Sequence, residues 1–378
     1  MLNESILKNE EKAVYELRKA YRQFGYLPYK MGKFEEYDFY VKNKDFLISD
    51  SIITFNATNG KLMALKPDVT LSIIKNYKDE PGTVQRVYYD ENVYRISEST
   101  NDYKEIMQTG LECFGEITMQ NKLEVIYLAA KSLSAISDDF VLEVSHLGIL
   151  SSVLDAIVGD IDDREELKSA LVTCIGEKNA HEISYICDSY GVSKDMTKRL
   201  QDFVSVYGDR EKTIQRLEEL FSDIKTESFN KAMVELKELS KAIGKSQFKD
   251  KVIFDFSIVD SMKYYNGVIF RGFISGIPES VLSGGQYDNL MKSVGKNGGA
   301  IGFAVYLDLL ENLNKSKNLY DVDVVLLYDE TDSFDRLLEE VAKLSEYGKN
   351  VSLQKQIPEN LSYKTLMKMT EKGAEIVG

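Results

Sequence analysis

The sequence predicts an α+β fold with strand-rich flanks, a helical middle part and a small α/β tail. Three observations support it: residues 86–115 form a hairpin pattern, residues 149–249 are dense in Glu and Lys, and residues 321–373 alternate between strand and helix patterns. We therefore expect three parts. These are a core domain formed by residues 1–148 and 250–318, a helical insertion at 149–249, and a small domain at 319–378.

Composition and charge exclude several classes of protein. The 378 residues include 47 Lys and Arg against 61 Asp and Glu, which gives a formal net charge of −14, and no basic run occurs. A surface that binds nucleic acid needs clustered positive charge, so we expect no nucleic-acid partner. Two histidines are too few for a His-based zinc site, and no metal site is expected.

The cysteines and the N-terminal segment indicate a cellular compartment. Cys113, Cys174 and Cys187 have no C-x-x-C spacing, and their odd number suits a reducing environment. The first residues lack the basic and apolar regions of a signal peptide, and no stretch approaches 18 consecutive apolar residues. We therefore expect a cytoplasmic protein that does not bind or span a membrane.

Helix and strand patterns alternate in the first part of the chain. Apolar residues at helical spacing predict a helix over 9–24, which Gly25 can end. The further expected elements are an extended segment at 26–40, strands at 46–55 and 62–65 joined by a turn at 56–60, and a helix opened by Pro67.

The hairpin at 86–115 has a polar face where an apolar one would be expected. A Val- and Tyr-rich strand is followed by a Ser/Thr/Asn/Asp loop at 97–102, and alternation predicts a second strand over 105–114. Gln108 and Glu112 share one face of this second strand. They indicate either a solvated face of an antiparallel sheet or the floor of a small-molecule site.

The remaining elements follow the same reasoning. Before the helical part we expect a helix at 122–134 and a strand at 140–144. After it we expect strands at 252–256 and 264–273, a Gly-Gly pair entering a helix at 281–291, and a Gly-rich turn running into a helix at 298–310. The tail reads as βαβα, with strands at 321–328 and 351–354 and helices at 334–348 and 362–373.

Five motifs in a fixed order carry a family resemblance. They are LKPDVT at 65–70, the hairpin with Arg95, Gln108 and Glu112, YYNGVIFRGF at 264–273, SGGQYDNL at 283–290 and GGAIGFAV at 298–305. Together they resemble the histidyl-tRNA synthetase family over residues 1–148 and 250–313. The resemblance implies a class II aminoacyl-tRNA synthetase-like antiparallel sheet flanked by helices, with a helical insertion.

The chain departs from that family where the family places charge for ATP. Arg95 is retained, either as an anion contact or as a structural partner for a nearby carboxylate. Ser97, Asp260 and Leu309 stand where the resemblance leads us to expect Glu, Arg and Arg. Amino-acid activation needs positive charge around the phosphates, so these departures imply no catalytic residue and no bound cofactor.

The amino-acid pocket of the family is retained in the sequence. The resemblance assigns the ammonium group of histidine to Asp68 and Thr70, its backbone to Gln108, and its two imidazole nitrogens to Glu112 and Tyr265. Tyr264, the other tandem tyrosine, is expected in the same histidine-binding pocket. A carboxylate can neutralise an ammonium group or accept from an imidazole N–H, which suits these residue types. The alternative is that these groups hydrogen-bond one another in a buried network.

This combination resembles the regulatory subunits of ATP phosphoribosyltransferase, a histidyl-tRNA synthetase-like group of bacterial histidine biosynthesis. The resemblance implies a non-catalytic subunit that binds the short-form catalytic subunit, supports its activity and helps confer feedback by free histidine. It also implies self-association, and tRNA is not an expected partner. Two alternatives stay open, an active histidyl-tRNA synthetase and a stand-alone histidine-binding protein.

Overall fold

The computed structural model describes residues 7–44, 47, 52–78, 80–96, 100–159, 161, 163–259, 264–313 and 320–377. The chain divides into two compact units, Met1–Leu313 and Asn314–Gly378. Within the described ranges, no helix has both the length and the apolar character needed to cross a membrane.

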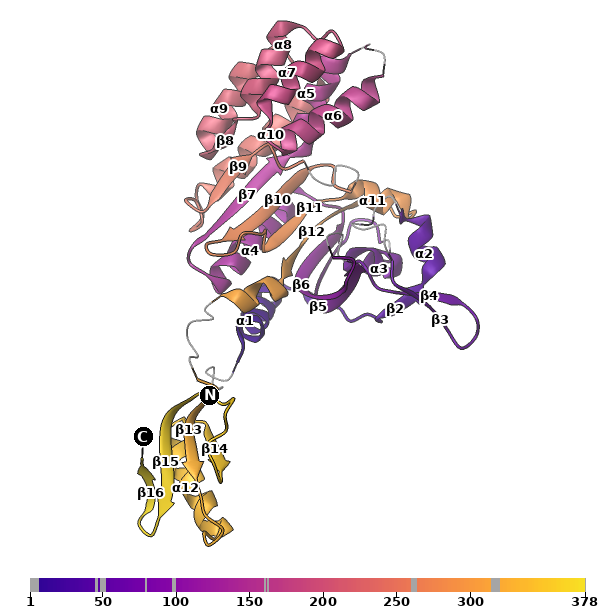
Figure 1. Ribbon diagram of the computed structural model, residues 1–378. Coiled ribbons are helices and arrows are strands. Elements are labelled where there is room, and N and C mark those ends of the chain that lie inside the picture. The colour runs from indigo at the N-terminus through magenta and orange to yellow at the C-terminus, as the bar shows by residue number, and fades with distance from the viewer. Residues whose placement is uncertain are drawn as a thin grey trace. The chain divides into compact units, whose positions relative to one another are not determined.

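The first unit is organised around a large sheet (Figure 1). Among the described residues it has nine strands in the order β1-β5-β6-β12-β11-β10-β7-β9-β8. Neighbouring strands are antiparallel except for the pairs β1–β5 and β7–β9. The strands are β1 (Leu27–Pro28), β5 (Val84–Ile96), β6 (Tyr103–Gly115), β7 (Phe140–His146), β8 (Tyr207–Gly208), β9 (Val252–Asp255), β10 (Val268–Ile274), β11 (Leu282–Gln286) and β12 (Gly299–Tyr306).

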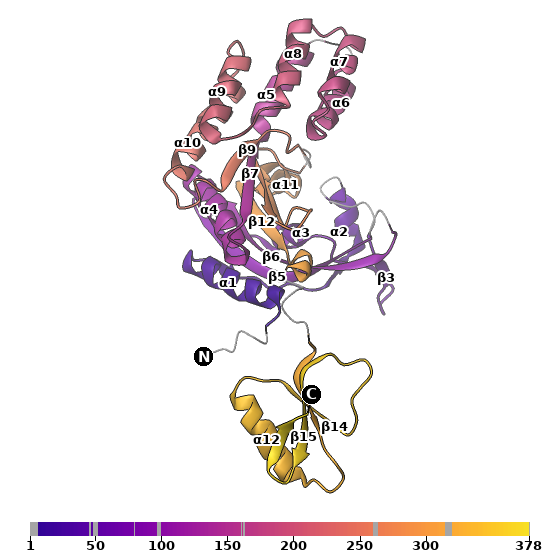
Figure 2. The same ribbon diagram turned by 60° about the vertical axis from the view of Figure 1, so that its left-hand side comes forward.

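Helices cover both faces of this sheet (Figure 2). α1 (Asn9–Gln23) and α4 (Met119–Ile136) lie on one face, where their apolar sides join the largest hydrophobic cluster. The other face carries a smaller cluster and a second sheet of order β2-β4-β3. The elements on that side are β2 (Phe34–Glu36), α2 (Tyr37–Lys42), β3 (Thr54–Asn56), β4 (Leu62–Leu65), α3 (Val69–Asn76) and α11 (Asp288–Ser293).

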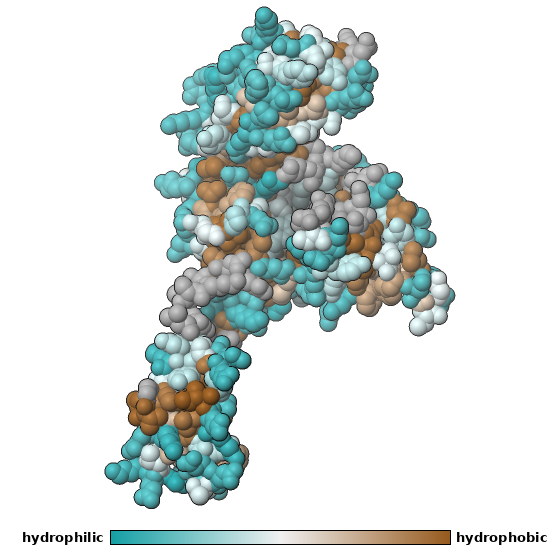
Figure 3. All heavy atoms as spheres, in the orientation of Figure 1, coloured by the Kyte–Doolittle hydropathy of each residue, from teal (hydrophilic) through white to brown (hydrophobic). Residues whose placement is uncertain are grey.

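Helices dominate the segment between β7 and β9. They are α5 (Leu147–Val158), α6 (Arg164–Gly176), α7 (Ala180–Ser189), α8 (Lys194–Phe203), α9 (Arg210–Leu220) and α10 (Glu227–Ile243). Their outer surface is mainly hydrophilic in the view of Figure 3, whereas their buried side chains belong to the same hydrophobic cluster as α4. The division of the chain at 148/149, 249/250 and 318/319 stays a prediction.

The central hairpin forms as the sequence predicts. β5 and β6 pair from Val84 opposite Gly115 to Ile96 opposite Tyr103. Leu111 points into the cluster that packs against α4, whereas its neighbour Glu112 lies on the opposite face. The polar face is buried, so the solvated-sheet explanation is wrong.

Two local predictions near α3 are wrong. Pro67 does not open the helix, because α3 begins at Val69 and Asp68 is its N-cap residue. The extended segment predicted over 26–40 turns helical at Tyr37, where α2 begins. Of the strand predicted over 46–55, the described residues form β3 at its end, and residues 46 and 48–51 lie outside the described part of the chain.

The two Gly-rich motifs are strands rather than turns, although the first does lead into a helix, α11. β11 contains the Gly-Gly pair, and β12 runs through the second motif before a 3₁₀ helix at Leu307–Asn312. Both strands lie in the interior of the sheet, where pairing on both edges overrides the weak strand propensity of glycine.

The second unit is a four-stranded sheet with one helix. The order is β14-β13-β15-β16, with β13 (Val322–Leu327), α12 (Phe334–Glu346), β14 (Val351–Gln354), β15 (Tyr363–Thr370) and β16 (Gly373–Ile376). The helix predicted over 362–373 is wrong, because β15 pairs with β13 and buries Met367 and Met369 in the same cluster as Leu337 of α12. This long-range pairing outweighs the helix propensity of Leu, Met and Lys.

Candidate functional site

A cavity of about 280 Å³ opens on the polar face of the sheet in the first unit. Its walls come from α3, from β5, β6, β10, β11 and β12, and from the segment before β10. All of the sequence-predicted site residues line it, namely Asp68, Thr70, Arg95, Gln108, Glu112, Tyr264 and Tyr265. The structure therefore brings together residues that are up to 197 positions apart, although their role in binding stays a prediction.

The register of the strands determines which side chains lie side by side along the bottom of the cavity. Glu112 on β6 is opposite Gly302 on β12, which in turn is opposite Gly285 on β11. Four residues further along each strand, Gln108 on β6 is opposite Tyr306 at the end of β12. Glu112 and Gln108 thus lie on the same face of β6, four residues apart, and line different parts of one cavity.

Glycines under the pocket let functional side chains lie against the sheet. A Cβ atom added at Gly302 would lie 1.7 Å from Oε2 of Glu112. A Cβ atom at Gly285 would lie 2.8 Å from the Tyr265 ring, and one at Gly110 would lie 2.6 Å from the Tyr89 hydroxyl. Each glycine is required for space, because real Cβ contacts do not occur at such separations.

Glu112 is the buried acid at the centre of the site. Its side chain accepts a hydrogen bond from the Thr70 hydroxyl at 2.6 Å and another from the Tyr287 hydroxyl. Burial raises the pKa of Glu112 to about 8, although these two hydrogen bonds oppose the increase. At neutral pH the carboxyl group is therefore mostly protonated in the unliganded protein.

Asp68 combines a structural role with its place in the cavity. Its Oδ1 accepts from the backbone N–H of Leu71 at 2.8 Å and caps α3. Burial raises the pKa of Asp68, whereas the nearby Arg95 guanidinium lowers it. Arg95 also donates from Nε to the carbonyl of Pro67 at 3.1 Å, which ties β5 to the start of α3.

Three tyrosine rings enclose the cavity beside Glu112. The ring centroids of Tyr264 and Tyr265 are 4.7 Å apart, and Tyr287 lies 5.6 Å from Tyr264 and 6.4 Å from Tyr265. Burial raises the pKa of each hydroxyl well above its usual value, so these groups are neutral and can both donate and accept.

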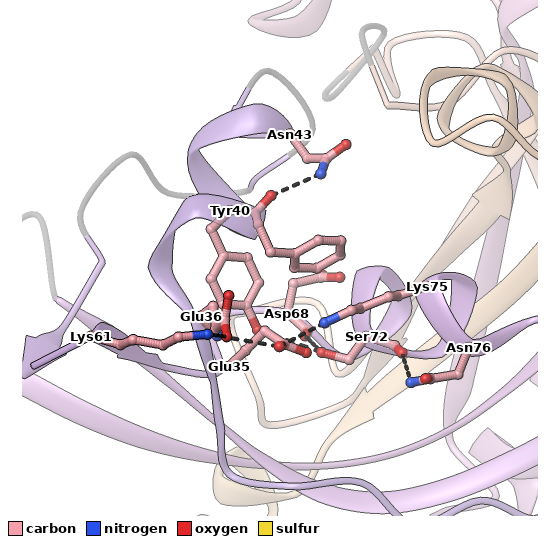
Figure 4. Close-up of polar contacts among 10 residues, drawn as sticks. Glu35, Glu36, Tyr40, Asn43, Lys61, Asp68, Ser72, Lys75 and Asn76 are labelled. Atoms are coloured by element: carbon pink, nitrogen blue, oxygen red, sulfur yellow. Dashed lines mark hydrogen bonds and ion pairs between the residues drawn. The ribbon is translucent and has the colours of Figure 1, made fainter. Parts of the chain in front are cut away.

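Contacts outside the cavity hold α3 in place (Figure 4). Lys75 near the end of α3 donates to Glu35 of β2 at 2.7 Å. The hydroxyls of Ser72 on α3 and Tyr40 on α2 are 3.5 Å apart, and both side chains are buried. These contacts fix the helix whose first turn supplies Thr70 to the pocket.

Sequence reasoning missed five polar residues of the cavity, of which Tyr89 lies on β5 and Ser283 on β11. Tyr287 follows the Gly-Gly-Gln sequence directly, Arg271 lies on β10, and Tyr306 ends β12. The alternation of β10 places Arg271 on the same face as Ile269, and that pattern was a usable signal. Tyr287 had no such signal, because it lies where β11 passes into α11.

Of the three positions where the chain departs from the family's charged residues, the structure describes only one. Leu309 packs against the main hydrophobic cluster, and Ser97 and Asp260 lie outside the described residues. No group of three or more His, Cys, Asp or Glu that could hold a metal ion occurs in the described part of the chain.

Known proteins resemble this chain over most of its length. A family model described as histidyl-tRNA synthetase matches residues 2–310. Two proteins named ATP phosphoribosyltransferase regulatory subunit are similar to it. The one from Oceanobacillus iheyensis is 27% identical, covering 79% of this chain and 73% of its own, and the one from Clostridium acetobutylicum is 26% identical, covering 96% and 90%.

Solved structures show the same fold. An ATP phosphoribosyltransferase regulatory subunit/histidyl-tRNA synthetase from Bacillus halodurans C has a TM-score of 0.76 at 24% identity, covering 95% of this chain and 93% of its own. A chain of the ATP phosphoribosyl transferase complex from Thermotoga maritima has a TM-score of 0.61 at 19% identity, covering 79% and 97%. The predicted α+β, class II synthetase-like fold and the predicted resemblance are both confirmed.

Proposed function

The chain belongs to the histidyl-tRNA synthetase family, and we propose that it acts there as a non-catalytic regulatory subunit of ATP phosphoribosyltransferase. In this proposal it binds the short-form catalytic subunit, supports its activity and transmits feedback inhibition by free histidine. Phosphoribosyl transfer itself takes place on the partner. The names of the similar proteins support the regulatory role, and the Thermotoga maritima complex supports a hetero-oligomer.

The observation that carries the histidine proposal is the pocket around Glu112. Its volume of about 280 Å³ is just below the range of roughly 300–1,000 Å³ that is typical of pockets for drug-sized ligands. A cavity of this size favours a ligand as small as an amino acid. Asp68 and Thr70 stand on one wall and can hold an ammonium group. Glu112 and Tyr265 can hold the two imidazole nitrogens from the floor.

The buried-network alternative explains only part of this arrangement. Thr70 and Tyr287 do bond to Glu112 inside the protein. If these groups only satisfied one another, they would pack together without a cavity between them. Instead, Thr70, Glu112 and Tyr287 line a cavity. A buried acid with a pKa of about 8 is also costly to keep ionised, and such groups concentrate at functional sites.

The partner proposal is tested by mixing the purified chain with the short-form catalytic subunit from the same organism. We expect the two to co-elute, turnover to rise well above that of the catalytic subunit alone, and histidine to suppress the increase. The coupling between histidine and the catalytic site should amount to about 5- to 150-fold in affinity. Separate elution together with unchanged turnover would refute the regulatory role.

The location of the histidine sensor is tested with Asp68→Asn. Asparagine keeps the cap of α3 but removes the charge that would hold the ammonium group. Histidine inhibition of the mixture should weaken, and stimulation in the absence of histidine should persist. The matched control is Glu238→Gln, an exposed position on α10. Unchanged inhibition in Asp68→Asn would place the sensor on the partner.

A further inference from the structure

The sheet of the second unit has an open edge at β14. This strand is the outermost one on its side of the sheet and, among the described strands, it pairs with β13 alone (Figure 1). The carbonyls of Asn350 and Gln354 accept hydrogen bonds at 3.0 Å from N–H groups on the β13 side. Backbone groups alternate in direction along a strand, so the N–H and C=O groups of Val351 and Leu353 point away from β13. They are available to another strand.

Apolar side chains of α12 lie beside this edge. Arg336 of α12 donates to the carbonyl of Thr370 at 2.8 Å, so this flank of the helix faces the turn between β15 and β16. Phe334 and Leu338 lie two residues before and after Arg336, and two residues correspond to about 200° around a helix. Both side chains are therefore on the opposite flank, toward β14. Their exposed fractions of 67% and 46% show that nothing in the described chain covers them.

A strand added to this edge would need a particular pattern of side chains. Its residues on the α12 side would meet Phe334 and Leu338 and should be apolar, whereas those on the other side can be polar. β14 itself has this pattern. Val351 and Leu353 pack against the hydrophobic cluster under α12, and the polar residues Ser352 and Gln354 alternate with them. The edge is therefore complementary to a second copy of itself.

We propose that the β14 strands of two copies of this chain pair with each other in antiparallel orientation about a twofold axis. In this register Val351 of one copy is opposite Leu353 of the other, and the two such pairs form four backbone hydrogen bonds. Ser352 lies on the axis, opposite Ser352 of the other copy. Phe334 and Leu338 of both copies cover the new strand pair, and the two sheets become one.

The competing explanation is that the edge is protected against pairing. β14 has only four residues and is flanked by Lys349 and Lys355, and short strands and lysines are common means of blocking an edge. Pairing would bring Lys349 of one copy near Lys355 of the other, but Glu330 lies 2.9 Å from Lys355 and offsets the repulsion. Protection also leaves the exposed apolar side chains of α12 without a role.

The test is disulfide cross-linking of the full chain carrying Ser352→Cys. Residues opposite each other in a non-hydrogen-bonded antiparallel pair have Cα atoms about 4.5 Å apart, which lies within the range of about 4.4–6.8 Å for disulfides. The matched control is Glu375→Cys, an exposed position on the opposite edge strand, β16. The native cysteines are all buried. With a mild oxidant and micromolar protein, Ser352→Cys should form a covalent dimer roughly a hundredfold faster than the control, because paired thiols have millimolar effective concentrations.

Two further measurements separate pairing from chance collisions. Adding Phe334→Glu and Leu338→Glu to Ser352→Cys should slow cross-linking to the control rate, whereas Ala342→Glu, at an exposed position elsewhere on α12, should not. In the chain without substitutions, the amide protons of Val351 and Leu353 should exchange slowly with solvent, and the double glutamate variant should exchange them rapidly. Equal cross-linking of Ser352→Cys and Glu375→Cys, or rapid exchange of both amides in the unsubstituted chain, would overturn the proposal.

Discussion

Replacing Glu112 by glutamine should increase the stability of the unliganded protein at alkaline pH while weakening histidine binding. The folded state raises the pKa of this acid from 4.5 to about 8 because the side chain is buried. Between these values the folded protein holds a proton that the unfolded chain releases. Stability is therefore highest below about pH 4.5 for this group, and it falls as the pH rises toward 8.

The size of the effect follows from the pKa difference. Each pH unit in this window costs about 1.4 kcal/mol, so the loss between pH 5 and pH 8 is on the order of 4 kcal/mol. Glutamine has no charge and removes this slope. It also disturbs the hydrogen bonds from Thr70 and Tyr287, but that cost of about 1 kcal/mol is nearly independent of pH.

The assay is urea denaturation of the wild-type chain and Glu112→Gln at several values between pH 5 and 8.5. The difference in unfolding free energy should change steadily in favour of the variant as the pH rises. Glu238→Gln, at an exposed position, should show no such trend. Above pH 8, where the wild-type carboxyl group is ionised, histidine binding to Glu112→Gln should be weaker by roughly 1.5–3 kcal/mol. A difference that is constant with pH would refute the assignment of a raised pKa to Glu112.

Three further outcomes are expected. Tyr287→Phe removes a hydrogen bond that lowers the pKa of Glu112, so the pH dependence of stability should extend to higher pH in the same assay. Lys66→Met breaks the buried 2.8 Å pair with Glu91 and should cost about 3–5 kcal/mol in urea denaturation, and adding Glu91→Gln should recover most of it. Purified chain should show no histidine-dependent ATP–pyrophosphate exchange; exchange at a measurable rate would favour an active synthetase instead.

Much of the core could be predicted from local patterns. The hairpin from β5 to β6 was predictable because both strands are long, alternate clearly and are joined by turn-forming residues. The site residues on it followed from the spacing of Gln108 and Glu112. Their neighbours on α3 and before β10 came from the family resemblance, since local patterns do not show which distant segments meet.

The wrong predictions of secondary structure have a common physical cause. β11, β12 and β15 are strands because of their partners, and their own residues favour turns or a helix. Alternation shows which face of β10 carries Arg271, but that this face borders the cavity depends on where β10 lies in the sheet, three strands from β6. Long-range pairing leaves little trace in the sequence of a single segment.

The floor beneath the cavity is formed largely by main chain. Glu112 and Tyr265 lie over Gly302 and Gly285, where even one added methyl group would collide with them. Side-chain walls can adapt to a new ligand by changing rotamers, but a main-chain floor has no rotamers to change. The depth of the pocket is therefore fixed by the sheet. Evolution or design could therefore alter ligand choice here only through the side chains of the walls.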